Sequence, residues 1–366
     1  MQGIKGRNVE DVFVSSLEGI FDAVHVSEIH DQAEAFVRKL GHVIFNAEIN
    51  RYKTGEPTGR PPSPSSLLSC YLDAFPHALA QDQNEAANKT QSVITSIILD
   101  LLSMSSQPDV TYQHILLILH QIANRFTALC LDDSWVRKRA GCSGIKIMTC
   151  TPDIGVKWVT DREVDLIRTL LHILKDLPLD LPRNVDDVVD VLIDVLKISH
   201  SGLNFQGEGI AVARSKLIHL MGIFFPELQS SNPVVRQASQ RCIGFLVNFS
   251  GRPAVELLMP HRDRMLAGIY TKPLRALPFS KQIGMIEAVR YCVSLDPPLV
   301  ELNDELLRLL HETLALADAE DAQLSGPRVR QGGVEIIKLR VACIKLLTAS
   351  MPLTDFFSRQ PQTRQR

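Results

Sequence analysis

The sequence lacks long apolar runs, has few aromatic residues and carries no marked excess of either charge. Its longest apolar runs, such as residues 115–119, are far too short to span a bilayer, and no apolar signal stretch opens the chain. The net charge is −2 and the pI is near 6.6, so electrostatics gives no reason to expect nucleic acid or an anionic membrane as a partner. We therefore expect neither direct nucleic-acid binding nor membrane binding.

The spacings that mark metal and catalytic sites are also missing. The seven cysteines form no Cys-x-x-Cys pair, and Cys142 and Cys150 lie more than two helical turns apart, too far for a metal clip. Gly207-Glu-Gly209 lacks both the third glycine and the preceding strand of a phosphate loop. We expect no catalytic, cofactor-binding or metal-binding residues, no cofactor and no small-molecule substrate, and we interpret the cysteines as core residues of a reducing compartment.

One acidic ladder keeps an enzyme hypothesis open. Asp186, Asp190 and Asp194 lie four residues apart on one face of a helical segment, and besides this ladder only the histidines scattered through the chain favour an enzyme. The opposite face carries an apolar stripe at residues 185, 188, 189, 192, 195 and 196. A productive carboxylate pair needs a cleft and opposing elements, so we expect this ladder to face water.

The chain consists mostly of amphipathic segments in which apolar residues recur at the spacing of a helix. Alternating strand patterns are missing, so the fold class expected is all-α, an α-solenoid of about seven HEAT-like antiparallel hairpins. The helices are expected at 9–24, 27–49, 65–81, 84–105, 110–131, 133–150, 160–176, 184–199, 208–225, 232–249, 253–269, 280–294, 303–319 and 333–350.

Two of these helices open with nearly the same phrase, Asp133-Ser-Trp-Val-Arg137 and Asn232-Pro-Val-Val-Arg236. The first residue of each can cap the free N–H groups of the first turn, and the arginine one turn later can reach a carboxylate or a turn carbonyl in the adjoining repeat. A third phrase, Leu339-Arg-Val-Ala342, lacks the upstream cap. We therefore expect Arg137 and Arg236 to set the stagger between repeats inside the stack.

The whole chain, 1–366, is expected to form one solenoid segment with a mobile loop at 51–66 and a disordered C-terminal tail at 358–366. The loop contains four prolines and few apolar residues. Terminal repeats of a solenoid normally carry a polar outer face, and residues 9–24 and 349–357 offer none. The isolated chain is therefore expected to associate or aggregate.

Several longer phrases resemble one known family. They are Tyr71-Leu-Asp-Ala-Phe-Pro-His-Ala-Leu79, Lys157-Trp-Val-Thr-Asp-Arg-Glu163, Leu174-Lys-Asp-Leu-Pro-Leu-Asp-Leu-Pro182, Lys272-Pro-Leu-Arg-Ala-Leu-Pro-Phe-Ser-Lys-Gln-Ile-Gly284, Ile286-Glu-Ala-Val-Arg-Tyr-Cys292, Leu314-Ala-Leu-Ala-Asp-Ala-Glu-Asp321 and Leu339-Arg-Val-Ala-Cys-Ile-Lys-Leu-Leu347. They are similar to the HEAT region of the TRRAP family in its fungal form, over most of residues 65–350. The chain has neither the pseudokinase of that family nor the helical domain before it, so it resembles a fragment of the solenoid.

The resemblance implies a nuclear, non-enzymatic scaffold. Members of the TRRAP family are very large pseudokinase proteins that bind transcription activators and tether histone acetyltransferase complexes of the SAGA type. The partners it implies are therefore proteins, namely activators and subunits of those complexes. Two alternatives stay open: a HEAT-repeat scaffold of another class, such as a nuclear transport receptor or a phosphatase scaffold, and, in a different class, an enzyme.

Overall fold

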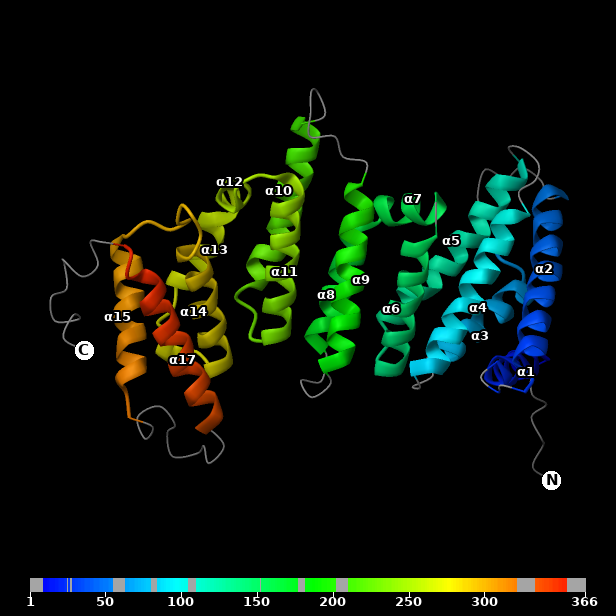
Figure 1. The fold of residues 1–366 in the computed structure, drawn as a ribbon, viewed down its shortest axis with the longest axis horizontal. Helices are drawn as coiled ribbons and strands as arrows, with labels where there is room; N and C mark the ends of the chain where they lie inside the picture. Colours follow the sequence, from blue (N-terminus) through cyan, green and yellow to red (C-terminus); the bar gives the residue numbers. More distant parts are fainter. Residues whose placement is uncertain are drawn as a thin grey trace. The chain divides into compact units, whose positions relative to one another are not determined.

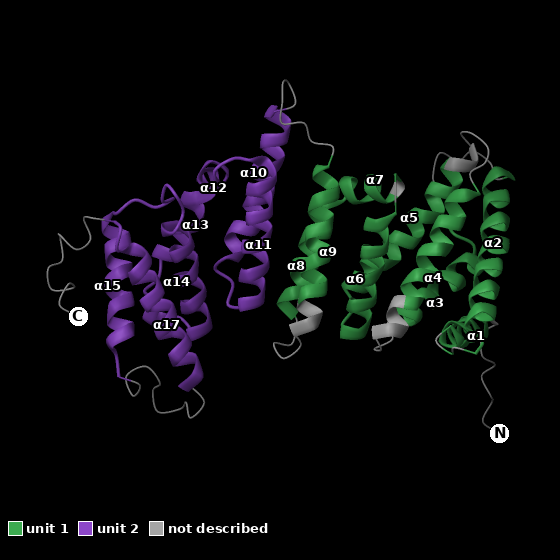
Figure 2. Cartoon of the chain, viewed as in Figure 1, with its two compact units in different colours: residues 1–201 green, residues 202–366 purple. Residues whose placement is uncertain are grey.

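The computed structural model describes residues 9–24, 26, 28–54, 63–79, 84–104, 110–151, 153–176, 182–201, 210–320 and 333–353. Every regular element within these ranges is an α-helix or a short 3-10 helix (Figure 1). The all-α prediction is therefore confirmed. The helices gather into two compact units, residues 1–201 and 202–366 (Figure 2).

The first unit is a stack of helices, some of which pack on the next helix along the chain and some on the one after it. α1 packs mainly on α3, α5 on α6 and α8 on α9, while α3 and α4 also contact α6. The helices of this unit are α1 (Val9–Ala23), α2 (His30–Thr54), α3 (Ser66–Leu79), α4 (Asn84–Ser103), α5 (Val110–Cys130), α6 (Trp135–Cys150), α7 (Ile154–Asp161), α8 (Glu163–Asp176) and α9 (Pro182–His200).

An aromatic cluster joins the first three helices of this unit. The Phe21 and Tyr71 rings each meet the Phe75 ring edge-on, with centroids 5.9 and 5.3 Å away, and Phe45 meets Tyr71 at 5.7 Å. The buried Tyr71 hydroxyl donates a hydrogen bond of 2.9 Å to the carbonyl oxygen of Val37. This bond satisfies a polar group that would otherwise be costly to bury, so the largest side chains can sit between α1, α2 and α3.

α5 and α6 approach each other closely because α6 carries glycine where it meets its partner. A Cβ atom added to Gly144 would lie 2.2 Å from the ring of Phe126, and one added to Gly141 would lie 2.6 Å from the Cys130 sulfur. The run Gly141-Cys-Ser-Gly144 therefore serves helix packing inside the hairpin.

The second unit begins with a hairpin and ends with a helix laid across two others. α10 packs on α11, and α17 packs on both α14 and α15. Its helices are α10 (Ile210–Glu227), α11 (Pro233–Ser250), α12 (Ala254–Leu258), the 3-10 turn η2 (Met259–His261), α13 (Arg262–Tyr270), the 3-10 turn η3 (Leu274–Ala276), α14 (Phe279–Val293), α15 (Asp304–Asp318) and α17 (Gly333–Ser350).

Two expected helices differ from those observed. The segment predicted as one helix over 253–269 is broken at η2, where Pro260 lacks the N–H that a continuing helix needs. The helix predicted at 160–176 starts at Glu163, and a short extra helix, α7, precedes it. The regular succession of hairpins expected from the sequence is therefore interrupted at these two places.

The loop predicted at 51–66 starts later than the sequence indicates, because α2 extends to Thr54. Residues 51–54 form the last turn of α2, and the carboxylate of Glu48 accepts hydrogen bonds from Arg51 at 2.5 Å and from the backbone N–H of Ser65 at 3.0 Å. This buried carboxylate ties the end of α2 to the residues before α3. The remaining loop residues 55–62, the tail 358–366 and Gly207–Gly209 lie outside the described residues.

The two repeat phrases differ in how they begin their helices. The Asn232 side chain accepts a hydrogen bond of 2.9 Å from the backbone N–H of Val234, so the predicted cap is confirmed there. The prediction for Asp133 is wrong, because α6 begins after Ser134, whose side chain makes no capping bond. The Asp132 carboxylate, in the turn before α6, instead accepts a hydrogen bond of 2.8 Å from the backbone N–H of Ser134.

Candidate interaction groove

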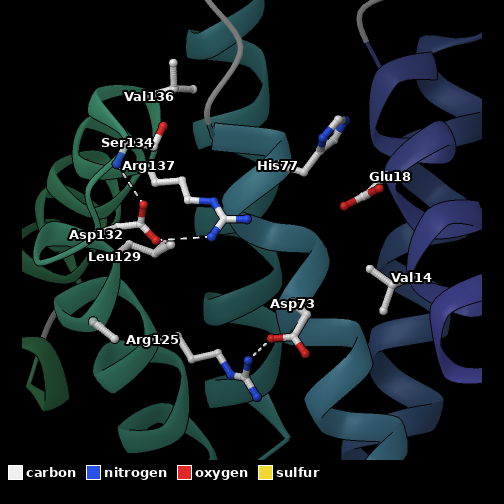
Figure 3. A pocket seen from close by; sticks show the side chains of 11 residues that line it. Val14, Glu18, Asp73, His77, Arg125, Leu129, Asp132, Ser134, Val136 and Arg137 are labelled. Atoms are coloured by element: carbon white, nitrogen blue, oxygen red, sulfur yellow. Dashed lines mark hydrogen bonds and ion pairs between the residues drawn. The ribbon is translucent and has the colours of Figure 1, made fainter.

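A groove of about 640 Å³ opens on the first unit between α1, α3, α5 and α6. Apolar side chains form part of its wall, and charged side chains from all four helices and the α5–α6 turn line it (Figure 3). Its lining residues are Val14, Glu18, Asp73, His77, Arg125, Ala128, Leu129, Asp132, Ser134, Val136 and Arg137.

The α3 side of the groove presents two polar residues one turn apart, Asp73 and His77, which share a face because helical residues four apart do. Asp73 forms an ion pair with Arg125 of α5, and the Nε2 atom of His77 lies 3.0 Å from the Asp22 carboxylate of α1. Burial lowers the pKa of Arg125 from its usual value, yet a guanidinium stays protonated in proteins. The Asp73–Arg125 pair therefore joins α3 to α5 across the floor of the groove.

The α5–α6 turn closes the other side. The Asp132 carboxylate accepts the Ser134 N–H through one oxygen, and through the other it lies 3.1 Å from Nη1 of Arg137. The hydrogen bond from the Ser134 N–H lowers the pKa of Asp132 most, and the bond from Arg137 lowers it further. This pKa therefore lies below its usual 3.8. Arg137 is 61% exposed and contacts its own turn, so the prediction that it sets the stagger between repeats is wrong.

The groove has the chemistry of a binding surface. Its two arginines are each paired with a carboxylate: Arg125 joins α5 to α3 through Asp73, and Arg137 pairs with Asp132 of the turn before its own helix. Val14, Leu129 and Val136 add apolar wall between the charged groups. A protein segment with polar and apolar side chains could lie along such a surface by exchanging water for hydrogen bonds.

The acidic ladder of α9 faces away from the core, as the sequence indicates. Val188, Val189, Leu192, Val195 and Leu196 are buried, whereas Asp186 and Asp190 are exposed, and Asp194 pairs with Lys197 at 2.9 Å. Six cysteines are buried and Cys150 is exposed. Within the described residues, no three His, Cys, Asp or Glu side chains gather as a metal site would require.

None of the helices in the described part of the chain combines the length and the apolar character needed to cross a membrane.

Sequence reasoning missed Asp73 and Arg125, the pair at the centre of the groove. Each is a lone charge in an apolar stretch, Tyr71-Leu-Asp-Ala-Phe75 and Ile122-Ala-Asn-Arg-Phe126. Both side chains are only partly buried, at 43% and 33% exposure, and a charge that loses part of its hydration usually has a partner. That signal identifies both residues as paired, but it does not say that they pair with each other.

The family model described as the Tra1 HEAT repeat ring region matches residues 4–366. The chain belongs to the Tra1 HEAT-repeat family. The resemblance to the TRRAP family and the α-solenoid fold class inferred from the sequence are thereby confirmed. The match runs through both units, so the groove and the helices around it are parts of one Tra1-family segment.

Three Tra1-family relatives illustrate the similarity. The chain is 30% identical to the "SAGA complex/NuA4 acetyltransferase complex subunit TRA1" of Saccharomyces cerevisiae over 96% of its length, and 32% identical to the Schizosaccharomyces pombe subunit of the same description over 82%. It is 23% identical to the human "Transformation/transcription domain-associated protein" over 81%. The chain spans 10%, 8% and 8% of these relatives.

Proposed function

We propose that this chain is a non-catalytic scaffold segment of a nuclear transcription coactivator, which binds transcription activators and helps to tether histone acetyltransferase complexes. The observation that carries the proposal is the family match over residues 4–366, together with relatives named as subunits of the SAGA and NuA4 complexes. A solenoid grows by stacking hairpins, so it offers long helical surfaces to other proteins. The family assignment favours this role over a nuclear transport receptor or a phosphatase scaffold.

The groove of the first unit supports a binding role over an enzymatic one. Its pairs join α1 to α3 through Asp22 and His77 and α3 to α5 through Asp73 and Arg125, while Arg137 pairs with Asp132 in the turn before its helix. Catalysis by acid and base would need titratable groups poised at a substrate with shifted pKa values. The pKa of Asp132 is lowered instead, so its carboxylate stays ionised and bound to Arg137.

A pull-down with purified proteins tests the proposal. The full chain, immobilised, is expected to retain subunits of SAGA-type or NuA4-type complexes and activation domains in a saturable manner. The same matrix carrying an unrelated HEAT-repeat protein serves as the control for binding to helical surfaces in general. Equal retention on both matrices, or retention of a small GTPase or a phosphatase catalytic subunit in place of coactivator subunits, would refute the proposal.

A double substitution in the groove locates the binding. Val136→Glu with Arg137→Glu changes two exposed residues at the rim, and the fold should survive because neither is buried. We expect a loss of partner retention of at least tenfold if the groove takes part. Val212→Glu with Met259→Glu, at exposed positions of the second unit, is the matched control and should retain partners as the unmodified chain does.

A further inference from the structure

Two residues with a side-chain hydroxyl stand directly before a proline in the sequence, Ser63 and Thr151. Thr151 is 1% exposed, and its hydroxyl donates a hydrogen bond of 2.9 Å to the carbonyl oxygen of Ile147. Ser63 is exposed, in the short stretch without regular structure that leads into α3. The two positions share a sequence pattern, but the fold keeps only the first of them at the surface.

The Ser63 hydroxyl also differs from those of the next two serines, because it makes no hydrogen bond to the described residues. The Oγ atom of Ser65 accepts a hydrogen bond of 3.2 Å from the Leu68 N–H, in the first turn of α3. The Ser66 hydroxyl donates to the Glu10 carboxylate of α1. Ser63 is therefore the one of the three whose oxygen can be modified without breaking a contact of α3.

Pro64 restricts the backbone of Ser63 to extended conformations. The residue before a proline is sterically kept out of the helical region, and the proline itself has no N–H to pair. Proline-directed protein kinases select a serine that is followed by proline, and they bind the chain around it in an extended form. Ser63 therefore offers such a kinase both the sequence and the conformation that it requires.

The last turn of α2 supplies positive charge next to Ser63. The Arg51 guanidinium donates from Nη2 to the carbonyl oxygen of Ser63, and it also bonds to the Glu48 carboxylate at 2.5 Å. Its side chain is 43% exposed, and exposed Lys53 lies two residues further along the same turn. A guanidinium has five N–H donors, so Arg51 can bind a phosphate and keep its bond to Glu48.

The start of α3 is also suited to a negative charge. Its first turn carries no acidic residue, and negative charge is favoured at a helix N-terminus. The nearby carboxylates of Glu48 and Glu10 each have a donor already, the first in Arg51 and the second in Ser66. A phosphate on Ser63 would therefore lie between a guanidinium and the positive end of a helix.

We propose that Ser63 is a phosphorylation site for a proline-directed protein kinase and that Arg51 holds the phosphate. The Ser63 oxygen forms a bond to the γ-phosphorus of ATP while the bond from that phosphorus to the β–γ bridging oxygen breaks. ADP leaves, and the hydroxyl proton passes to the base of the kinase. The phosphate then ties the start of α3 to the end of α2 through charge-assisted hydrogen bonds. This site goes beyond the proposed function, and neither depends on the other.

Phosphorylation of the full chain by a purified proline-directed kinase and ATP, mapped by mass spectrometry, tests the proposal. We expect one phosphate per chain, on Ser63, and at least tenfold slower incorporation in Pro64→Ala. Ser63→Ala should remove the signal, whereas Ser66→Ala, a matched change at an exposed serine three residues away, should leave the rate unchanged. Phosphate on another residue in place of Ser63, or no phosphate at all, would overturn the proposal.

A titration of the phosphorylated chain by phosphorus NMR shows whether Arg51 holds the phosphate. An exposed phosphoserine has a second pKa of about 6, and a bound guanidinium lowers this pKa because it favours the dianion. We expect a lower pKa in the full chain than in a phosphorylated peptide of residues 59–68. Arg51→Ala should remove this difference, and Lys39→Ala, at an exposed position of α2, is the matched control and should preserve it.

Equal pKa values in the unmodified chain and in the peptide would refute the role of Arg51. This comparison needs no variant, so it decides the question even if Arg51→Ala does not fold, which circular dichroism reports.

Discussion

The guanidinium of Arg236 donates a hydrogen bond of 2.7 Å from Nη1 to the carbonyl oxygen of Ser230, in the turn just before its own helix. Arg340 does the same at longer range, donating 2.6 Å from Nη2 to the carbonyl oxygen of Ala319 at the end of α15. Carbonyls at a helix end or a turn lack helical partners, so a partly buried guanidinium that donates to them stabilises them. Arg236 and Arg340 thus each tie a helix to the segment that precedes it, and for Arg236 this revises the expectation that it sets the stagger between repeats.

Removing Arg236 should destabilise the second unit. Arg236→Ala leaves the Ser230 and Ser231 carbonyls without their charged donor, so we expect the free energy of unfolding to fall by about 2 kcal/mol. Urea denaturation followed by circular dichroism measures the change. Arg137→Ala is the matched control at the same place in the other repeat phrase, where the arginine is largely exposed and should give no measurable change. Equal effects of the two substitutions would contradict this account.

The glycines of α6 should not tolerate a methyl group. Gly144→Ala places a Cβ atom against the Phe126 ring, so we expect a loss of about 1–3 kcal/mol of stability. Trp135 and Trp158, the chain's two tryptophans, both lie in the first unit, so tryptophan fluorescence in a urea titration reports on it. Gly19→Ala in α1 is the matched control in the same unit, because nothing lies within 4 Å of its added Cβ, and it should stabilise by about 0.5–1 kcal/mol. A stable Gly144→Ala variant would refute the close approach of α5 and α6.

The buried carboxylate of Glu48 should make the first unit sensitive to acid. Burial raises its pKa, but hydrogen bonds from Arg51 and Ser65 outweigh burial and hold the pKa below the usual 4.5. A carboxyl group with a lowered folded-state pKa stabilises the fold above pH 4.5, and this contribution is lost as the pH falls through the folded-state value. Glu48→Gln should therefore lower Tm near neutral pH, and its difference from the unmodified chain should shrink below pH 4.5. A difference that stays constant with pH would contradict this.

The isolated chain is expected to associate. Phe36 and Val43 of α2 are both more than half exposed and lie seven residues apart, so α2 offers an apolar surface to another molecule. Light scattering should give a weight-average mass above the 40.8 kDa of the monomer, rising with concentration. Phe36→Glu with Val43→Glu should lower it toward 40.8 kDa. A monodisperse monomer at every concentration would refute the prediction.

Most of the helices could be placed from the sequence because their apolar residues recur at the helical period. α9 shows this well: its stripe predicted which face is buried, and Val188, Leu192 and Val195 are buried as expected. The break at Pro260 was missed, although proline interrupts a helix, because the apolar period continues through it. The cap predicted at Asp133 is wrong because α6 begins one residue later and the Asp132 carboxylate accepts the Ser134 N–H instead.

The sequence by itself determined the all-α class, the positions of most helices and the resemblance to the TRRAP family, because periodicity and long phrases are properties of neighbouring residues. Only the tertiary structure decided that Asp73 meets Arg125 and that Ile337 and Ile344 stay exposed while Leu339 and Leu346 are covered. Both faces of α17 are apolar, so its composition cannot tell them apart. Which face is buried depends on where α14 and α15 lie, and that is set by packing between segments far apart in the chain.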